Sequence, residues 1–364
     1  MTKNNAPDLK APLLTSSYVS AIRPIRADEK VNYPKGVGSI GGIYDSSDQP
    51  HIDSLLIRGA PTLLMQAHEN AIEIKRDAAT RITDKSIYGG ILTNHYGHIL
   101  LESLARTWYL LDSTGDVYFY HLQHNKKDST YDDLSGWQQV ILSHLVTDPS
   151  RIKLINKPLI FDELIVPEAG LVGKNFCAPI HRDALVLLGS KITANCSKDI
   201  VADKIWLSRS LLNKGAIAGE TKFETALSGE GFLVVHPETL SIAEQIKLFE
   251  NASVVCGFTG SAFHTLLLAK NKGAKLIHFS RLSHMNNNYH LCAKAAGFDA
   301  EYYNYYLKSG ESKGIGGSVL QDLTGIWRLL HRKGLVRTRI YKDPTMKEDL
   351  KRLDETIRNP RTWS

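Results

Sequence analysis

Residues 252–280 read ASVVCGFTGSAFHTLLLAKNKGAKLIHFS, and this stretch decides the predicted fold. An apolar run ends in a glycine-containing turn, a segment with helical spacing follows, and a second apolar run begins after Lys-Gly. This order predicts a strand, a helix and a second strand, the repeating unit of a parallel sheet. Similar candidates extend upstream to residue 204 through KIWLSRS, GFLVVHPE and LSIAEQIKLFENA. We therefore predict right-handed crossovers and a mostly parallel sheet, whose ligands bind at the carboxyl ends of its strands.

The remaining chain is also predicted to be α/β. TNHYGHILLESLARTWYLL (residues 93–111) predicts an amphipathic helix, DVYFYHL a strand and LSGWQQVILSHL a second helix, whereas the first 85 residues offer only short strand candidates. VLQDLTGIWRLLHRKG and MKEDLKRLDETIRN predict helices near the end of the sequence. We predict an N-terminal α/β domain over 1–190, a C-terminal α/β domain over 191–315 and a helical tail over 316–364.

Composition and charge narrow the class of protein. The 364 residues are 43% hydrophobic and 23% charged, which is typical of a globular protein of about two domains. No apolar run reaches the roughly 18 residues that a membrane span needs, and MTKNNAPDLKAPLLTSS does not resemble a secretory signal, so we expect a cytoplasmic protein. The formal charge of +6 suits a phosphate-bearing ligand or an anionic membrane face, but no basic run predicts binding to nucleic acid.

The four cysteines are far apart and form no CxxC pair. This spacing predicts neither a zinc site nor a disulfide framework, and we expect reduced thiols.

The segment 93–111 carries the first candidate for chemistry. On a helix with 100° per residue, His95, His98, Glu102 and Arg106 share one narrow arc, separate from the leucine-rich face. Histidine titrates near neutral pH and a carboxylate one turn away sets its tautomer, so His98 with Glu102 predicts a general-base pair. The alternatives are that the histidines are core or capping residues, or that H-x2-H-x3-E binds a metal, although this spacing matches no zinc motif.

The second candidate is the turn between the strand and the helix of residues 252–270. Gly257 and Gly260 allow close backbone approach, Thr259 and Ser261 supply hydroxyl donors, and His264 follows on the first helical turn. Exposed N–H groups and a helix N-terminus there would bind phosphate. The turn lacks G-x-G-x-x-G and G-x4-G-K-[ST], so we do not expect a dinucleotide fold of the usual type or an NTPase.

WLSRS supplies a third candidate. It places Arg209 just after a strand, where a guanidinium suits a diphosphate; the alternative is a surface ion pair.

Taken in order, these segments resemble glycosyltransferase family 61, in particular bacterial enzymes of capsule and surface polysaccharide synthesis. NHYGHILLESLARTWYL resembles the N-terminal segment of the family, IWLSRS its strand ending in Ser-Arg, and the block from ETKFETALSGEGF to AKLIHF its C-terminal region. The resemblance covers about residues 88–112 and 203–280. It implies a GT-B-like fold, in which two Rossmann-like domains face a cleft, and inverting sugar transfer without a metal or other cofactor.

The resemblance also implies roles for individual residues. His98 and Glu102 are expected to be catalytic, with Asn94, His95 and Arg106 on the acceptor side. The donor and its phosphates are expected to contact a second set of residues, namely Arg209, Glu220, Thr259, Gly260, Ser261 and His264.

We therefore expect transfer of a sugar from a nucleotide-sugar donor to a glycan or lipid-linked glycan acceptor, by a cytoplasmic enzyme that associates peripherally with the inner membrane. The absence of a suitably placed DxD-like acidic pair agrees with metal-independent transfer. One alternative is a nucleotide- or sugar-binding protein without turnover, because Thr259 stands where many relatives have histidine. A second alternative is another sugar-nucleotide enzyme of the same architecture, such as an epimerase.

Overall fold

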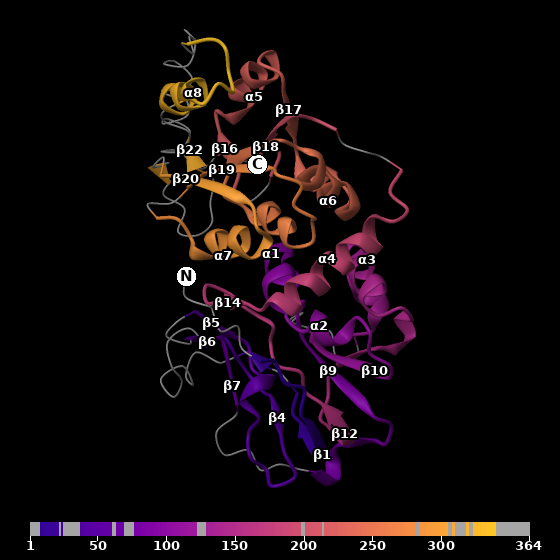
Figure 1. Ribbon diagram of the computed structural model, residues 1–364. Helices are drawn as coiled ribbons and strands as arrows, with labels where there is room; N and C mark the ends of the chain where they lie inside the picture. Colours follow the sequence, from indigo (N-terminus) through magenta and orange to yellow (C-terminus); the bar gives the residue numbers. More distant parts are fainter. Residues whose placement is uncertain are drawn as a thin grey trace. The chain divides into compact units, whose positions relative to one another are not determined.

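In the computed structural model the chain forms two compact units, Met1–Asn195 (unit 1) and Cys196–Ser364 (unit 2). Each unit has its own sheet and its own covering helices (Figure 1). The structure describes residues 8–21, 23–24, 37–59, 63–68, 76–121, 129–197, 201–212, 215–281, 284–304, 308–309, 318–319 and 323–339.

The sheet of unit 2 confirms the prediction of parallel strands. Its order is β17-β15-β18-β19-β20, and every neighbouring pair is parallel. The strands are β15 (Lys204–Leu207), β17 (Phe232–Val235), β18 (Val254–Phe258), β19 (Lys275–Phe279) and β20 (Asp299–Tyr303). Because parallel strands of one sheet end at the same edge, the residues that follow β15, β18 and β19 are brought together there.

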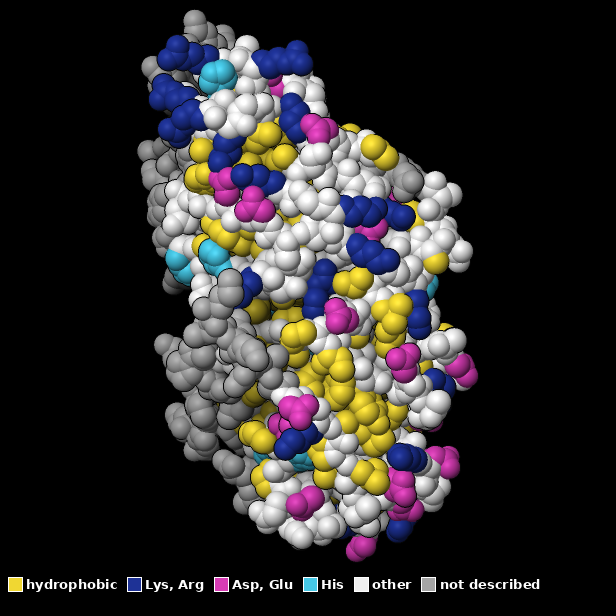
Figure 2. Space-filling model, viewed as in Figure 1, with side chains coloured by type: hydrophobic (Ala, Val, Ile, Leu, Met, Phe, Trp, Pro, Cys, Tyr) yellow, Lys and Arg dark blue, Asp and Glu magenta, His cyan; other side chains and the backbone are white. Residues whose placement is uncertain are grey.

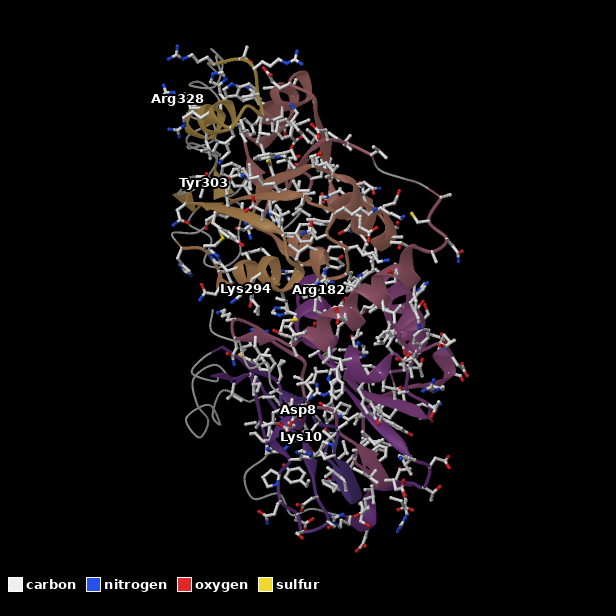
Figure 3. All side chains as sticks on the ribbon, in the orientation of Figure 1. Asp8, Lys10, Arg182, Lys294, Tyr303 and Arg328 are labelled. Atoms are coloured by element: carbon white, nitrogen blue, oxygen red, sulfur yellow. The ribbon has the colours of Figure 1, made fainter. Side chains whose placement is uncertain are left out.

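Helices cover both faces of this sheet (Figure 1). The buried rings of Trp206, Phe223 and Trp327 pack edge to face between the sheet, α5 (Glu220–Gly229) and α8 (Leu323–Arg332). Helix α8 thus belongs to the core of unit 2, and Arg328 lies on its exposed side (Figure 3). The other face carries α6 (Ile242–Asn251), the 3₁₀ helix η8 (Ser261–Leu267) and α7 (Asn287–Ala296). Three short strands form a separate sheet, namely β16 (Ile217–Ala218), β21 (Lys308–Ser309) and β22 (Ser318–Val319).

Unit 1 is built on a mixed sheet of seven strands. The order is β11-β10-β9-β12-β1-β4, with β8 also paired to β12; β1 is antiparallel to both of its neighbours and the other pairs are parallel. The strands are β1 (Leu13–Val19), β4 (Ile43–Tyr44), β8 (Thr80–Ile82), β9 (Ser86–Leu92), β10 (Asp116–His121), β11 (Ile152–Ile155) and β12 (Leu159–Ile165). Helices α3 (Gly136–Leu145) and α4 (Pro179–Thr193) pack on each other.

The rest of unit 1 consists of short pieces. Paired strands are β2 (Arg23–Pro24), β3 (Ser39–Ile40) and β7 (Gln66–Ala67), then β5 (Ile57–Arg58) with β6 (Leu63–Leu64), and β13 (Leu171–Val172) with β14 (Phe176–Cys177). Such short strands with irregular connections explain why the first 85 residues carry little periodic signal.

The prediction of one regular helix over 93–111 is wrong. The chain forms α1 (Tyr96–His98), a π-helical turn η4 (Ile99–Ser103), a tight turn and α2 (Thr107–Leu110). The Leu104 N–H donates to the carbonyl of Ile99 at 3.0 Å, five residues back instead of four. The wider turn adds one residue, so everything after it is rotated by about 100° relative to the predicted helix.

Among the described residues, no helix is long and apolar enough to cross a membrane. All four cysteines are free thiols, with Cys256 and Cys292 buried. The predicted helix MKEDLKRLDETIRN lies outside the described residues.

Candidate functional site

In unit 1 the predicted pair, His98 and Glu102, is completed by Arg58. The Nδ1 atom of His98 lies 3.0 Å from Oε1 of Glu102, and the Arg58 Nε–H donates to the same oxygen at 2.5 Å. Arg58 Nη2 also approaches this oxygen and lies 2.9 Å from His98 Nδ1. The Glu102 side chain is 5% exposed and the His98 side chain 38% exposed, so the carboxylate is buried while the imidazole reaches solvent.

The contact between His98 and Glu102 fits one tautomer of the imidazole. A guanidinium has only donors and an ionised carboxylate only acceptors, so Nδ1 faces an acceptor in Glu102 and a donor in Arg58. With a proton on Nδ1, His98 and Arg58 both donate to the shared oxygen of Glu102, and the approach of Arg58 Nη2 to Nδ1 is then not a hydrogen bond. The neutral imidazole then carries its lone pair on Nε2, as a general base requires.

The other predicted residues of this segment differ in placement. Asn94 and His95 are exposed, and the His95 ring lies 4.8 Å from that of His98. Arg106 is buried instead, and it donates to the carbonyls of Pro167 at 2.7 Å and Asp53 at 2.5 Å. The π-helical turn thus moves Arg106 off the face that carries His98.

His95, His98 and Glu102 do not form a group that could hold a metal ion, and no other such group of three His, Cys, Asp or Glu occurs in the part of the chain that the structure describes.

In unit 2 two arginines meet beyond the carboxyl ends of β15 and β19. Arg209 donates through Nε to the carbonyl of Gly215 at 2.9 Å, and Arg281 donates through Nε to the carbonyl of Thr259 at 2.6 Å. No carboxylate of the described residues forms a salt bridge with either guanidinium. The terminal nitrogens of both arginines therefore remain available to an anion.

Two glycines leave room for these guanidiniums. A Cβ at Gly215 would lie 2.7 Å from Nη2 of Arg209 and 2.9 Å from Nη1 of Arg281, so the two cations converge on one point. A Cβ at Gly260 would overlap Nη1 of Arg209. Burial, and then the neighbouring Arg281, lower the pKa of Arg209 to about 10, which still leaves it charged at neutral pH. Two like charges at this distance favour an anionic ligand between them.

Glu220 orients the chain at Arg209. It is buried and accepts hydrogen bonds from Trp206 Nε1–H at 3.0 Å and from the backbone N–H of Arg209 at 3.0 Å. Burial raises the pKa of its carboxyl group to about 8, against the opposing effect of these two donors. The predicted donor-side residue Glu220 thus holds the backbone that precedes the guanidinium.

This raised pKa makes stability depend on pH. The folded state binds the Glu220 proton more tightly than the unfolded chain, whose carboxyl has a pKa near 4.5. The stability contributed by this proton is complete below that value and is lost as the pH rises through about 8. In urea unfolding followed by tryptophan fluorescence, we expect the unfolding free energy of the wild type to fall from pH 5 to 9 relative to that of Glu220→Gln. Parallel pH curves for the two proteins would contradict this assignment.

The turn at residues 257–261 contributes its backbone and Thr259 to this region, but the prediction of a regular helix after it is wrong. Helix η8 is a seven-residue 3₁₀ helix, too short to supply a strong dipole. Ser261 is partly exposed at its first position, and His264 is buried with its ring stacked on Tyr289 at 5.0 Å. A phosphate beside this turn would therefore depend on the arginines for its binding.

Sequence reasoning missed Arg58 and Arg281. Arg281 had a detectable signal, because HFSR repeats the pattern of WLSR, in which Ser-Arg directly follows a strand of the same sheet. Arg58 had none, since its two-residue strand reaches Glu102 only through the folding of unit 1.

Together, the parallel sheet with its paired arginines and the His-Glu pair of the other unit define an α/β protein equipped to bind an anionic ligand and to accept a proton. The glycosyltransferase 61 family model matches residues 96–277, half of the 364 residues. The chain therefore belongs to glycosyltransferase family 61 and is a glycosyltransferase, as the resemblance implied. The match includes His98 and Arg209 but neither Arg58 nor Arg281. A search of curated proteins found no match to this chain.

Proposed function

We propose that the protein transfers a sugar from a nucleotide-sugar donor to a glycan or lipid-linked glycan acceptor in bacterial capsule or surface polysaccharide synthesis. The observation that carries this proposal is the pair of guanidiniums beyond β15 and β19, whose terminal nitrogens converge beside Gly215. A diphosphate has two adjacent anionic groups, and planar guanidinium forks bind such groups with parallel hydrogen bonds.

The proposed reaction inverts the anomeric centre. His98 Nε2 accepts the proton of an acceptor hydroxyl, whose oxygen forms a new bond to the anomeric carbon while the bond between that carbon and the diphosphate oxygen breaks. The nucleoside diphosphate leaves with an added negative charge, which Arg209 and Arg281 stabilise. Because the guanidiniums neutralise this charge, the proposed reaction needs no metal ion.

A GT-B-like arrangement would suit this separation of roles, with the donor-binding groups on unit 2 and the base on unit 1.

We further propose a cytoplasmic location with peripheral attachment to the inner membrane. Figure 2 shows Lys and Arg side chains around α8, and Arg328, Arg332, Arg337 and Arg339 there are exposed. Positive charge of this kind favours an anionic membrane surface. Sedimentation with vesicles rich in anionic lipid tests this location, and equal sedimentation with neutral vesicles would contradict it.

Nucleotide release from UDP, GDP and CMP sugars, with and without EDTA, tests the reaction. We expect release from one class of donor, unchanged by EDTA and stimulated by an acceptor glycan. Loss of release in EDTA that Mg²⁺ or Mn²⁺ restores would contradict a metal-independent reaction.

The same experiment separates the alternatives. A binding protein without turnover would be stabilised against heat by a nucleotide but would release none from any donor, with or without acceptor. An epimerase would convert the sugar while leaving the nucleotide attached, which product analysis would show.

A further inference from the structure

Arg58 lies in β5, forty-four residues before Glu102 in the chain, and both of its contacts go to the candidate base pair. Its Nε and Nη2 atoms approach one oxygen of Glu102, while Nη2 lies 2.9 Å from His98 Nδ1. The Arg58 side chain is 24% exposed, so solvent screens this cluster only partly. The positive charge of Arg58 therefore interacts electrostatically with both His98 and Glu102.

Glu102 depends on Arg58 for its charge balance. Its second oxygen, Oε2, is buried and accepts no hydrogen bond within the described parts of the chain. Among those residues, only Arg58 and His98 form hydrogen bonds with Oε1 of Glu102. Without Arg58, His98 would be the one remaining partner of the buried Glu102 carboxylate among the described residues. The uncompensated negative charge of Glu102 would then favour protonation of the His98 imidazole.

We propose that Arg58 is a positioning residue which balances the charge of Glu102, so that Glu102 orients His98 without holding it in the protonated state. This inference rests on the proposed role of His98 as the base. A base must be free of its proton before it can accept one from the acceptor hydroxyl, and the Glu102 carboxylate alone would oppose that state.

Three titratable or charged groups of unit 1 face His98 among the described residues, and they act in opposite directions. Glu102 favours the imidazolium, whereas Arg58 and His95 oppose it. Partial desolvation of its ring, and then the nearby His98, lower the pKa of His95, which reduces the positive charge that His95 carries near neutral pH. Arg58 is thus the cation that offsets Glu102.

Carbethoxylation of His98 by diethyl pyrocarbonate tests this inference without any substrate. The reagent reacts with the unprotonated imidazole, and fragmentation of the peptide that carries both histidines distinguishes His98 from His95. In Arg58→Met we expect the midpoint pH of His98 modification to rise by about one unit, which makes modification about tenfold slower below the midpoint. Glu102→Gln should lower the midpoint, and Arg58→Lys, which keeps the charge, should leave it near the wild-type value.

Arg81→Met is the matched control, because Arg81 is 66% exposed and pairs with Asp162 in the same unit. An unchanged midpoint in folded Arg58→Met would overturn the inference. If Arg58→Met does not fold, Arg58→Gln replaces it with the same expected rise in the midpoint pH.

The outcomes for the proposed function and for the role of Arg58 can be told apart. A shifted midpoint in a protein that transfers no sugar would refute the proposed function alone, whereas sugar transfer with an unshifted midpoint would refute the role of Arg58 alone. In an active enzyme, the kcat/KM of Arg58→Met should also recover at high pH, which a merely structural defect would not produce.

Discussion

His98→Ala is expected to lower kcat for sugar transfer by about 10²- to 10⁴-fold while leaving the affinity for the nucleotide-sugar donor essentially unchanged. General-base catalysis contributes a factor of this size, and we propose the lone pair of His98 Nε2 as its source. The arginines proposed to bind the donor lie in unit 2 and the imidazole in unit 1, so the substitution removes none of the proposed phosphate contacts. Single-turnover transfer rates and donor binding by calorimetry would measure the two quantities separately.

The matched control is His144→Ala, because His144 lies near the end of α3 and donates through Nδ1 to the carbonyl of Val140 at 2.8 Å. It should retain wild-type kcat. Full activity in His98→Ala would refute the assignment of the base. A loss of donor affinity equal to the loss of kcat would instead identify His98 as a binding residue.

The second large effect is expected at Gly260, where a single methyl group should weaken donor binding about as much as the loss of Arg209. Gly260 is extended, with φ −165° and ψ 166°, so alanine fits its backbone without strain. The added Cβ would overlap Nη1 of Arg209 and displace the guanidinium. A charged hydrogen-bonding group of this kind contributes a factor of about 10 to 100 in affinity, which we expect to be lost in Gly260→Ala and in Arg209→Ala.

Gly229→Ala supplies the control, since no atom lies within 4 Å of the position of its Cβ. It should bind the nucleoside diphosphate as the wild type does. Calorimetric titration with the nucleoside diphosphate measures all three variants, and thermal unfolding checks that Gly260→Ala remains folded. Wild-type affinity in folded Gly260→Ala would show that the position of Arg209 does not govern binding.

Local sequence determined most of the architecture of unit 2, because four of the five strands in its main sheet are short apolar runs followed by a turn or polar segment. The exception is β20, whose sequence DAEYY is not an apolar run and was not predicted as a strand. The runs that end at Leu207, Val235, Phe258 and Phe279 were all recognisable, and so were α6 and α8. Parallel pairing then follows from helical crossovers, which need no knowledge of distant contacts. The position of Arg209 beyond a strand end was predictable for the same reason.

In unit 1 local sequence predicted β10 and α3 correctly, but it did not predict how the sheet is paired. Strand β1 joins the central sheet through antiparallel pairing with β12, which is more than one hundred residues later in the chain. The π-helical turn at residues 99–103 was also hidden, since helical periodicity assumes a constant rotation per residue. That assumption placed Arg106 beside His98, although the fold buries Arg106 among backbone carbonyls.

By itself, the sequence determined the class of protein, the parallel sheet of unit 2, the His98–Glu102 pair and the position of Arg209 after its strand, because spacing along the chain carries each of these. Only the tertiary structure decided which charges meet: Arg58 with Glu102, and Arg281 with Arg209 beside Gly215. These contacts join segments that are far apart in sequence. Their strength depends on burial and on distances of a few ångströms, which no local pattern encodes.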